Sequence, residues 1–133
     1  MSQILQGMVD ARVKLMIDTY VTTGSDEDIG TTIKMGPVLP ANARILQVIL
    51  GVNGTLGSGS TTLAVGDSDT AARYIAATAI NGNIVLNNSA KSAGVNYIIG
   101  TATGDNQILI TTAAAHNSTA SRTITLIVIY ALD

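Results

Sequence analysis

The sequence predicts an all-β domain, and three observations support this class. Short apolar runs alternate with polar residues at a period of two from Val13 to Leu132, which is the pattern of strands with one buried face. Segments rich in Gly, Asn, Asp and Ser separate these runs and supply turns. The chain has 133 residues, the size of one domain. About eight short strands with polar turns predict an antiparallel β-sandwich with a jelly-roll-like topology over residues 13–133.

The first two strands are expected at 13–22 and 29–35. In the first, Leu15 and Ile17 belong to a mainly aliphatic face and the other face is mixed, so we interpret the strand as half buried. Residues 23–28 are turn formers and charged residues. We therefore expect these two strands to form a hairpin.

A loop and a central strand come next. Residues 36–43 contain both prolines of the chain. Proline removes a backbone donor and biases the residue before it away from helix, so we expect a loop that crosses the domain. The strand at 44–52 is expected to be central, and one of its faces carries Leu46, Val48, Leu50 and Val52.

The middle of the chain is less regular. Residues 70–78 leave two alternatives open: a short capped helix or an irregular strand. The dipeptide Asn81-Gly82 predicts a turn. Further strands are expected at 61–65, 84–86, 95–100 and 107–112, the last two joined as a hairpin.

The final strand, at 122–131, has the strongest pattern. Ile127 and Ile129 lie on the face opposite Leu126 and Val128. A strand that is apolar on both faces needs cover on both. We therefore interpret Ile127 and Ile129 as partner-binding residues of a homo-oligomer, and we expect Ile127→Asp to disrupt assembly or folding.

Composition disfavours several function classes. Hydrophobic residues make up 47% of the chain, charged residues 12% and aromatic residues 3%. The net charge is −2 and the few Lys and Arg are dispersed, so we expect no nucleic-acid partner. The longest apolar stretch is far shorter than the ~20 residues of a membrane helix, so we expect no membrane association. With no Cys and one His, we expect no cofactor.

Two local motifs have chemical alternatives. The segment Gly66-Asp67-Ser68 resembles the opening block of GDSL-type hydrolases, but the only histidine, His116, does not follow the required pattern. We interpret this segment as a turn, assign no catalytic residue and expect no enzyme. The carboxylates of residues 26–28 with Asp67 and Asp69 lack the spacing of a calcium loop. We interpret them as solvated turn residues and assign no metal site.

Residues 1–12 do not share the strand pattern. They carry Ile4, Leu5, Met8 and Val9 between polar residues. One interpretation is a frayed terminus. The other is an extended arm that lays these four apolar side chains on a neighbouring protein, because disordered tails are usually polar.

Four successive segments give the chain a family resemblance: LPANARI (39–45), VNGTL (52–56), VGDSDTAARYIAAT (65–78) and ITLIVIY (124–130). Together they resemble small virion proteins of tailed bacteriophages, among them capsid decoration or cement proteins with a jelly-roll-type fold. The resemblance covers about residues 13–133. It brings no catalytic residues.

The resemblance implies a homo-oligomer, dimer or trimer, bound to the major capsid protein. Such a protein lies on the outer surface of the icosahedral phage head, bridges capsid subunits and is made in the host cytoplasm. The alternative is a lectin-like or receptor-binding β-module of a phage fibre or tail. The chain has no Trp and no strong calcium motif, which argues against that alternative.

Overall fold

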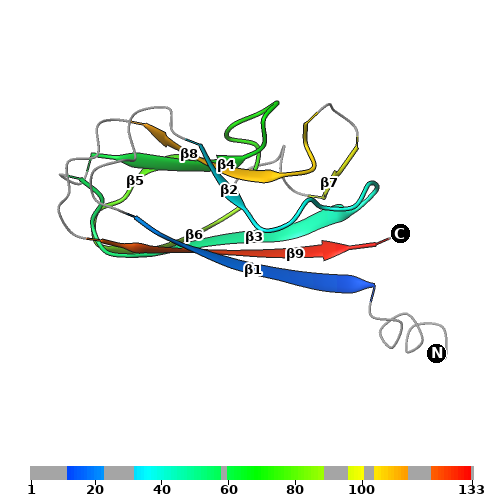
Figure 1. Cartoon of the computed structure of the whole chain (residues 1–133), viewed down its shortest axis with the longest axis horizontal. Coiled ribbons are helices and arrows are strands. Elements are labelled where there is room, and N and C mark those ends of the chain that lie inside the picture. Colours follow the sequence, from blue (N-terminus) through cyan, green and yellow to red (C-terminus); the bar gives the residue numbers. More distant parts are fainter. Residues whose placement is uncertain are drawn as a thin grey trace.

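The computed structural model describes residues 12–22, 32–57, 60–88, 96–100, 104–113 and 121–132. Every strand in this part of the chain belongs to one of two antiparallel sheets, stacked as the layers of a sandwich (Figure 1). These residues include no helix, and the all-β prediction is confirmed. Sheet A contains β1 (Val13–Val21), β9 (Thr123–Ala131), β3 (Arg44–Asn53), β6 (Asn83–Asn87) and β7 (Tyr97–Ile98), and sheet B contains β2 (Thr32–Met35), β8 (Ile108–Ala113), β4 (Thr62–Gly66) and β5 (Ile75–Ala79).

The strand order is that of a jelly roll. Sheet A has the order β1-β9-β3-β6, with β7 beside β3, and sheet B has the order β2-β8-β4-β5. The chain pairs from its ends inward, β1 with β9, β2 with β8, β3 with β6 and β4 with β5, and successive pairs alternate between the sheets. The predicted sandwich with jelly-roll-like topology is therefore confirmed.

Two predicted hairpins are wrong. β1 pairs with β9 and β2 pairs with β8, so these neighbours in sequence lie in different sheets. Likewise β7 pairs with β3, and β8 pairs with β2 and β4. Turn-forming residues mark the end of a strand but do not choose its partner. In this jelly roll β2 follows β1, and β8 follows β7, in the opposite layer.

β3 is central in sheet A as expected, but the predicted grouping of its residues by face needs a correction. Its register with β9 shifts between Ile45 and Gln47, a bulge that inserts Leu46. Ile45 is fully buried, while Leu46 is 37% exposed. Val48, Leu50 and Val52 share a face as predicted, and that face packs in the core with the side chains of Met35, Leu63, Ile108, Ile110, Ile124 and Leu126.

Residues 70–78 form a turn and then β5, so the irregular-strand alternative is right. The buried carboxylate of Asp67 organises this turn. Its Oδ1 accepts hydrogen bonds from the backbone N–H groups of Asp69 and Thr70, at 3.0 and 2.8 Å, and its Oδ2 accepts one from Arg73 Nε. A side chain close to the predicted helix start therefore stabilises a turn instead.

Tyrosines connect this turn to the segments around β7. The guanidinium carbon of Arg73 lies 3.9 Å from the centre of the Tyr97 ring, a cation–π contact. Tyr97 packs edge-to-face on Tyr74, and its hydroxyl donates to Asp105 Oδ2 at 2.7 Å. Tyr74 is fully buried, and its hydroxyl has no hydrogen-bond partner within the described residues. Burial, with a smaller contribution from Asp67, raises the pKa of this phenol well above its ordinary value, so Tyr74 is neutral.

One contact closes the side of the sandwich where β1 and β2 meet. The carboxylate of Asp18, in β1, accepts a hydrogen bond from the backbone N–H of Gly36 at 2.7 Å, directly after β2. Gly36 has φ +66°, and a Cβ there would lie 2.2 Å from Met16 Sδ. Glycine is therefore needed at this position both for the backbone and for packing.

Candidate functional site

The candidate site is the outer face of sheet A, the face that points away from sheet B. The register places alternate residues of the paired strands on this face. Its members are Val13, Leu15, Ile17, Thr19 and Val21 on β1, Thr123, Thr125, Ile127, Ile129 and Ala131 on β9, Gln47, Ile49, Gly51 and Asn53 on β3, and Asn83, Val85 and Asn87 on β6.

Both residues assigned on the final strand lie in the middle of this face. Ile127 is opposite Ile17 on β1 and Ile49 on β3, and Ile129 is opposite Leu15. Both side chains are half-buried. Neighbouring strands cover their flanks and leave their tips open, so a partner at this position would complete their burial.

β1 adds a raised apolar stripe at the edge of the same face, which we call the β1 ridge (Val13, Leu15, Ile17 and Val21). Each of these side chains is 57–60% exposed. β1 is the outermost strand of sheet A, and Figure 1 places it along the lower margin of the molecule. The sequence pattern identified these residues as the aliphatic side of β1, but the core receives the other side, with Met16 buried and Tyr20 packed against the core.

Charge is nearly absent from this face. By the same register Arg44, directly opposite Ala131, also lies on this face, and it is the one charged residue among the described members. It lies at one end of the sheet. A solvent-facing sheet usually alternates core residues with charged or polar ones. A sheet face with so little charge has a small desolvation cost to oppose burial against another protein.

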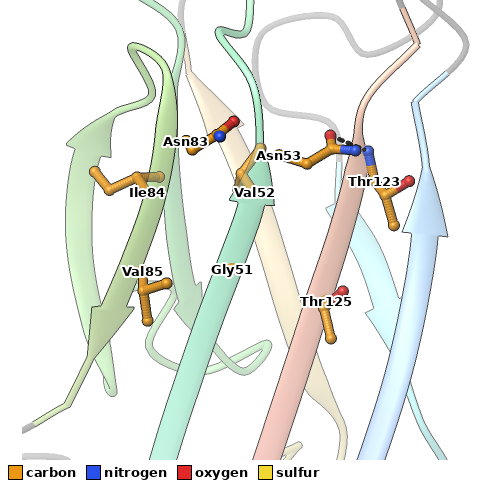
Figure 2. Close-up of a pocket in the computed structure, with 8 residues that line it drawn as sticks. All are labelled: Gly51, Val52, Asn53, Asn83, Ile84, Val85, Thr123 and Thr125. Atoms are coloured by element: carbon orange, nitrogen blue, oxygen red, sulfur yellow. Dashed lines mark hydrogen bonds between the residues drawn. The ribbon is translucent and has the colours of Figure 1, made fainter.

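The face contains an open groove of about 540 Å³, which we call the Gly51 groove (Figure 2). Gly51 forms its floor, and Val85 and Thr125 stand on either side. Asn53 and Asn83 lie at one end, where Asn53 Oδ1 accepts a hydrogen bond from the backbone N–H of Thr123 at 2.8 Å. Val85, 73% exposed, forms the wall opposite the β1 ridge.

The interior offers much less space. A second cavity, lined by residues that include Thr22, Thr61 and Thr112, has a volume of about 10 Å³. That is about the space of one water molecule. In the described part of the chain, the surface is therefore a better candidate for binding than the core.

The remaining sequence candidates divide into two groups. Ile4, Leu5, Met8 and Val9 of the predicted arm, His116 and residues 26–28 lie outside the described residues. Ser68 Oγ donates to the carbonyl of Gly104 at 2.8 Å, and Asp67 is bonded to Arg73.

Two further observations concern metals and membranes. The described residues contain no group of three or more His, Cys, Asp or Glu side chains arranged to hold a metal. In the same residues, no helix has the length and apolar character needed to cross a membrane.

Comparison with solved structures finds this fold in two phage capsids. A chain of the cyanophage Pam1 capsid asymmetric unit superposes with a TM-score of 0.70 at 22% identity, covering 91% of this chain and 85% of that chain. A chain of the capsid of Ralstonia phage GP4 gives a TM-score of 0.65 at 22% identity, covering 90% and 85%. The sequence itself matches no family model and no curated protein. These likenesses establish the fold, over nearly the whole length of chains of similar size.

Sequence reasoning missed the β1 ridge and the Gly51 groove. The alternation in β1 is clear, but it does not say which side faces the core. The mixed side of β1, which carries Met16 and Tyr20, is the side that faces the core. The polar residues of that side, Lys14 and Asp18, are tolerated because long or hydrogen-bonded side chains can lie at the margin of a core. The groove depends on Val85 and Thr125 flanking Gly51 across three strands, which no local pattern reveals.

Proposed function

We propose that this protein is a capsid decoration, or cement, protein of a tailed bacteriophage. In this proposal it binds the outside of the icosahedral head as a homo-oligomer, bridges major capsid protein subunits and stabilises the shell. It is made in the host cytoplasm and resides on the virion. The role is structural and needs neither a cofactor nor catalysis.

The observation that carries the proposal is the outer face of sheet A, which combines exposed aliphatic side chains with a single charged described residue, Arg44, on a jelly roll of this size. Five of its side chains, the β1 ridge and Val85, are more than half exposed. Burying an aliphatic side chain of this kind contributes roughly 1.5–3 kcal/mol. A contiguous set on one face is typical of a surface that meets another protein.

The likeness to the two capsid chains supports a place in a virion. Both neighbours are components of phage capsids by their descriptions, and both resemble this chain over most of their own length. A net charge of −2 favours a position away from packaged nucleic acid, where basic surfaces are needed. Together these points favour the outside of the head.

The anchoring part of the proposal concerns the N-terminal segment. Ile4, Leu5, Met8 and Val9 are the apolar residues that would contact the capsid. The gain per arm is reduced by the entropy of ordering it, but several arms on one oligomer add their binding through avidity. Apolar attachment should also weaken little as salt rises.

Co-sedimentation with undecorated heads tests this proposal. Full-length protein should pellet with heads at a fixed stoichiometry, and its occupancy should change less than about threefold between low and high salt. Deletion of residues 1–11 keeps the hydrogen bond from Leu132 N to the Arg12 carbonyl and should release the protein from heads while its β circular dichroism is unchanged. Unchanged occupancy of the truncated form would refute the anchoring role, and no binding by the full chain would refute decoration.

A lectin-like or receptor-binding module is the second candidate. The polar end of the Gly51 groove, with two asparagines and two threonines, is the observation in its favour. None of the described residues that line this groove is aromatic, whereas sugars are usually bound against aromatic rings. A glycan array with the full-length protein separates the two functions.

A further inference from the structure

The Gly51 groove is not explained by the chain's own packing. Gly51 lies inside β3 without a positive φ. A Cβ built there has no heavy atom of the described residues within 4 Å. Glycine within a strand weakens it, because the unfolded chain gains freedom and no side chain packs. Neither the backbone nor the fold therefore requires glycine, and a bare strand of this kind suits the close approach of another chain.

The same face carries the exposed apolar side chains of the β1 ridge. The β1 ridge lies two strands away from β3, about 10 Å at the usual spacing between strands. β9, with Ile127 and Ile129, lies between them. Ridge and groove thus stand on either side of a central apolar strand, which is the arrangement a two-fold axis needs for a surface to match itself.

From this geometry we propose that two copies of the chain pack outer face to outer face. The axis runs along β9, so β1 of each copy lies over β3 of the other, with Thr19 level with Gly51 and the ridge residues Ile17 and Val21 on either side of it. Ile127 and Ile129 of both copies meet at the centre. The proposal deepens the homo-oligomer of the proposed function by naming its interface and its symmetry.

Area and charge both favour a second copy as the occupant. Four strands of up to nine or ten residues span about 19 Å by 30 Å. Two such faces with their side chains bury on the order of 1,000 Å², the size at which a specific interface becomes stable. Arg44, at one end of the sheet, is the one charged residue among the described members of the face, so like-charge repulsion between two copies is confined to that end. Sheets of β-sandwiches pack in this face-to-face manner.

Filling the groove tests the proposal. Gly51→Val adds a β-branched side chain where the chain has open space, so the fold should be at least as stable. The dimer should weaken by 100-fold or more. Ala79→Val, at an exposed position on β5 in sheet B, is the matched control and should leave the dimer unchanged. The oligomeric state is measured on full-length protein by sedimentation equilibrium, and folding by thermal melts.

Each outcome of these measurements either supports or overturns the proposed dimer. A dimeric wild type, a folded monomeric Gly51→Val and a dimeric Ala79→Val support the interface. The proposal is overturned if the wild type is a trimer, if the wild type is a monomer at about 100 µM, or if Gly51→Val still dimerises. If the wild type is monomeric and Gly51→Val loses head binding, the face docks on the capsid, and the proposed function stands without this dimer. If the dimer behaves as described but never binds heads, the interface stands and the proposed function fails.

Discussion

The outer faces of the two sheets differ sharply, although both belong to short amphipathic strands. On sheet A, the β1 ridge and Val85 expose five large aliphatic side chains. On sheet B, the outward positions of β2, β8 and β4 include Thr32, Lys34, Thr111 and Thr62, and Leu109, a large aliphatic residue there, is only 9% exposed. One layer thus presents threonines and a lysine to water, and the other presents a surface suited to contact with protein.

The difference teaches that a strand's hydrophobicity does not by itself locate the core. β1 is aliphatic on its solvent side and β2 on its inner side, where Ile33 and Met35 are buried. The core of a jelly roll is closed from both layers, so an additional apolar face remains for assembly. Three pairs of substitutions test how far this contrast extends.

The largest effect is expected for Ile17→Asp, in the middle of the β1 ridge. The side chain is 60% exposed, so the free energy of unfolding should change by less than about 1 kcal/mol. Assembly should weaken at least 100-fold, because an aliphatic contact is lost and a carboxylate would be desolvated. Thr32→Asp on sheet B is the control and should assemble normally. If sedimentation shows that both variants assemble equally well, the outer faces of the two sheets do not differ in their role in assembly.

A smaller effect separates two neighbours on β9. Leu126→Ala removes a fully buried side chain and should lower the free energy of unfolding by about 2–5 kcal/mol. Ile127→Ala, one residue on, should cost the isolated monomer less than about 1.5 kcal/mol, because this side chain is only half-buried. Urea titrations below the association concentration measure both. Similar losses would mean that the outer face is already covered within one chain.

The smallest effect is expected for substitutions of Tyr74 and Tyr97, which pack against each other. The buried Tyr74 hydroxyl lacks a hydrogen-bond partner among the described residues. Tyr74→Phe should therefore leave stability unchanged or raise it by up to about 1 kcal/mol. Tyr97→Phe loses the bond to Asp105 and should cost about 1–2 kcal/mol. Thermal melts of the two variants measure this difference, and a marked loss in Tyr74→Phe would indicate a partner for that hydroxyl.

Much of the fold could be predicted from the sequence, because period-two alternation is local. Eight of the nine described strands overlap their expected ranges, and β5 lies where the sequence left helix and irregular strand open. The proline-containing loop connects the two sheets as expected. The pairing of β1 with β9 and of β2 with β8 could not be predicted, since it joins residues far apart in sequence. The bulge at Leu46 could not be predicted either, because an inserted residue changes which face the neighbouring side chains occupy without changing the composition of the strand.

The candidate site was predictable in part. Ile127 and Ile129 stood out because their strand is apolar on both faces, and whether they contact a partner is still a prediction. Gly51 carries no such signal, since its meaning comes from the side chains beside it on other strands. The pairing of β3 with β6 and β9 shows that Val85 and Thr125 lie beside Gly51.

The contact at Asp18 has a consequence for how this edge of the sheet meets other molecules. The backbone groups of Arg12 and Thr22 bond to the β9 side, so those of Thr19, an odd number of residues away, point away from β9. Asp18 Oδ1 accepts from Thr19 N at 2.8 Å and so occupies a donor that a foreign strand would need. An apolar edge without such a contact can recruit strands one after another into fibres. The Asp18 carboxylate therefore makes strand addition at this edge less favourable.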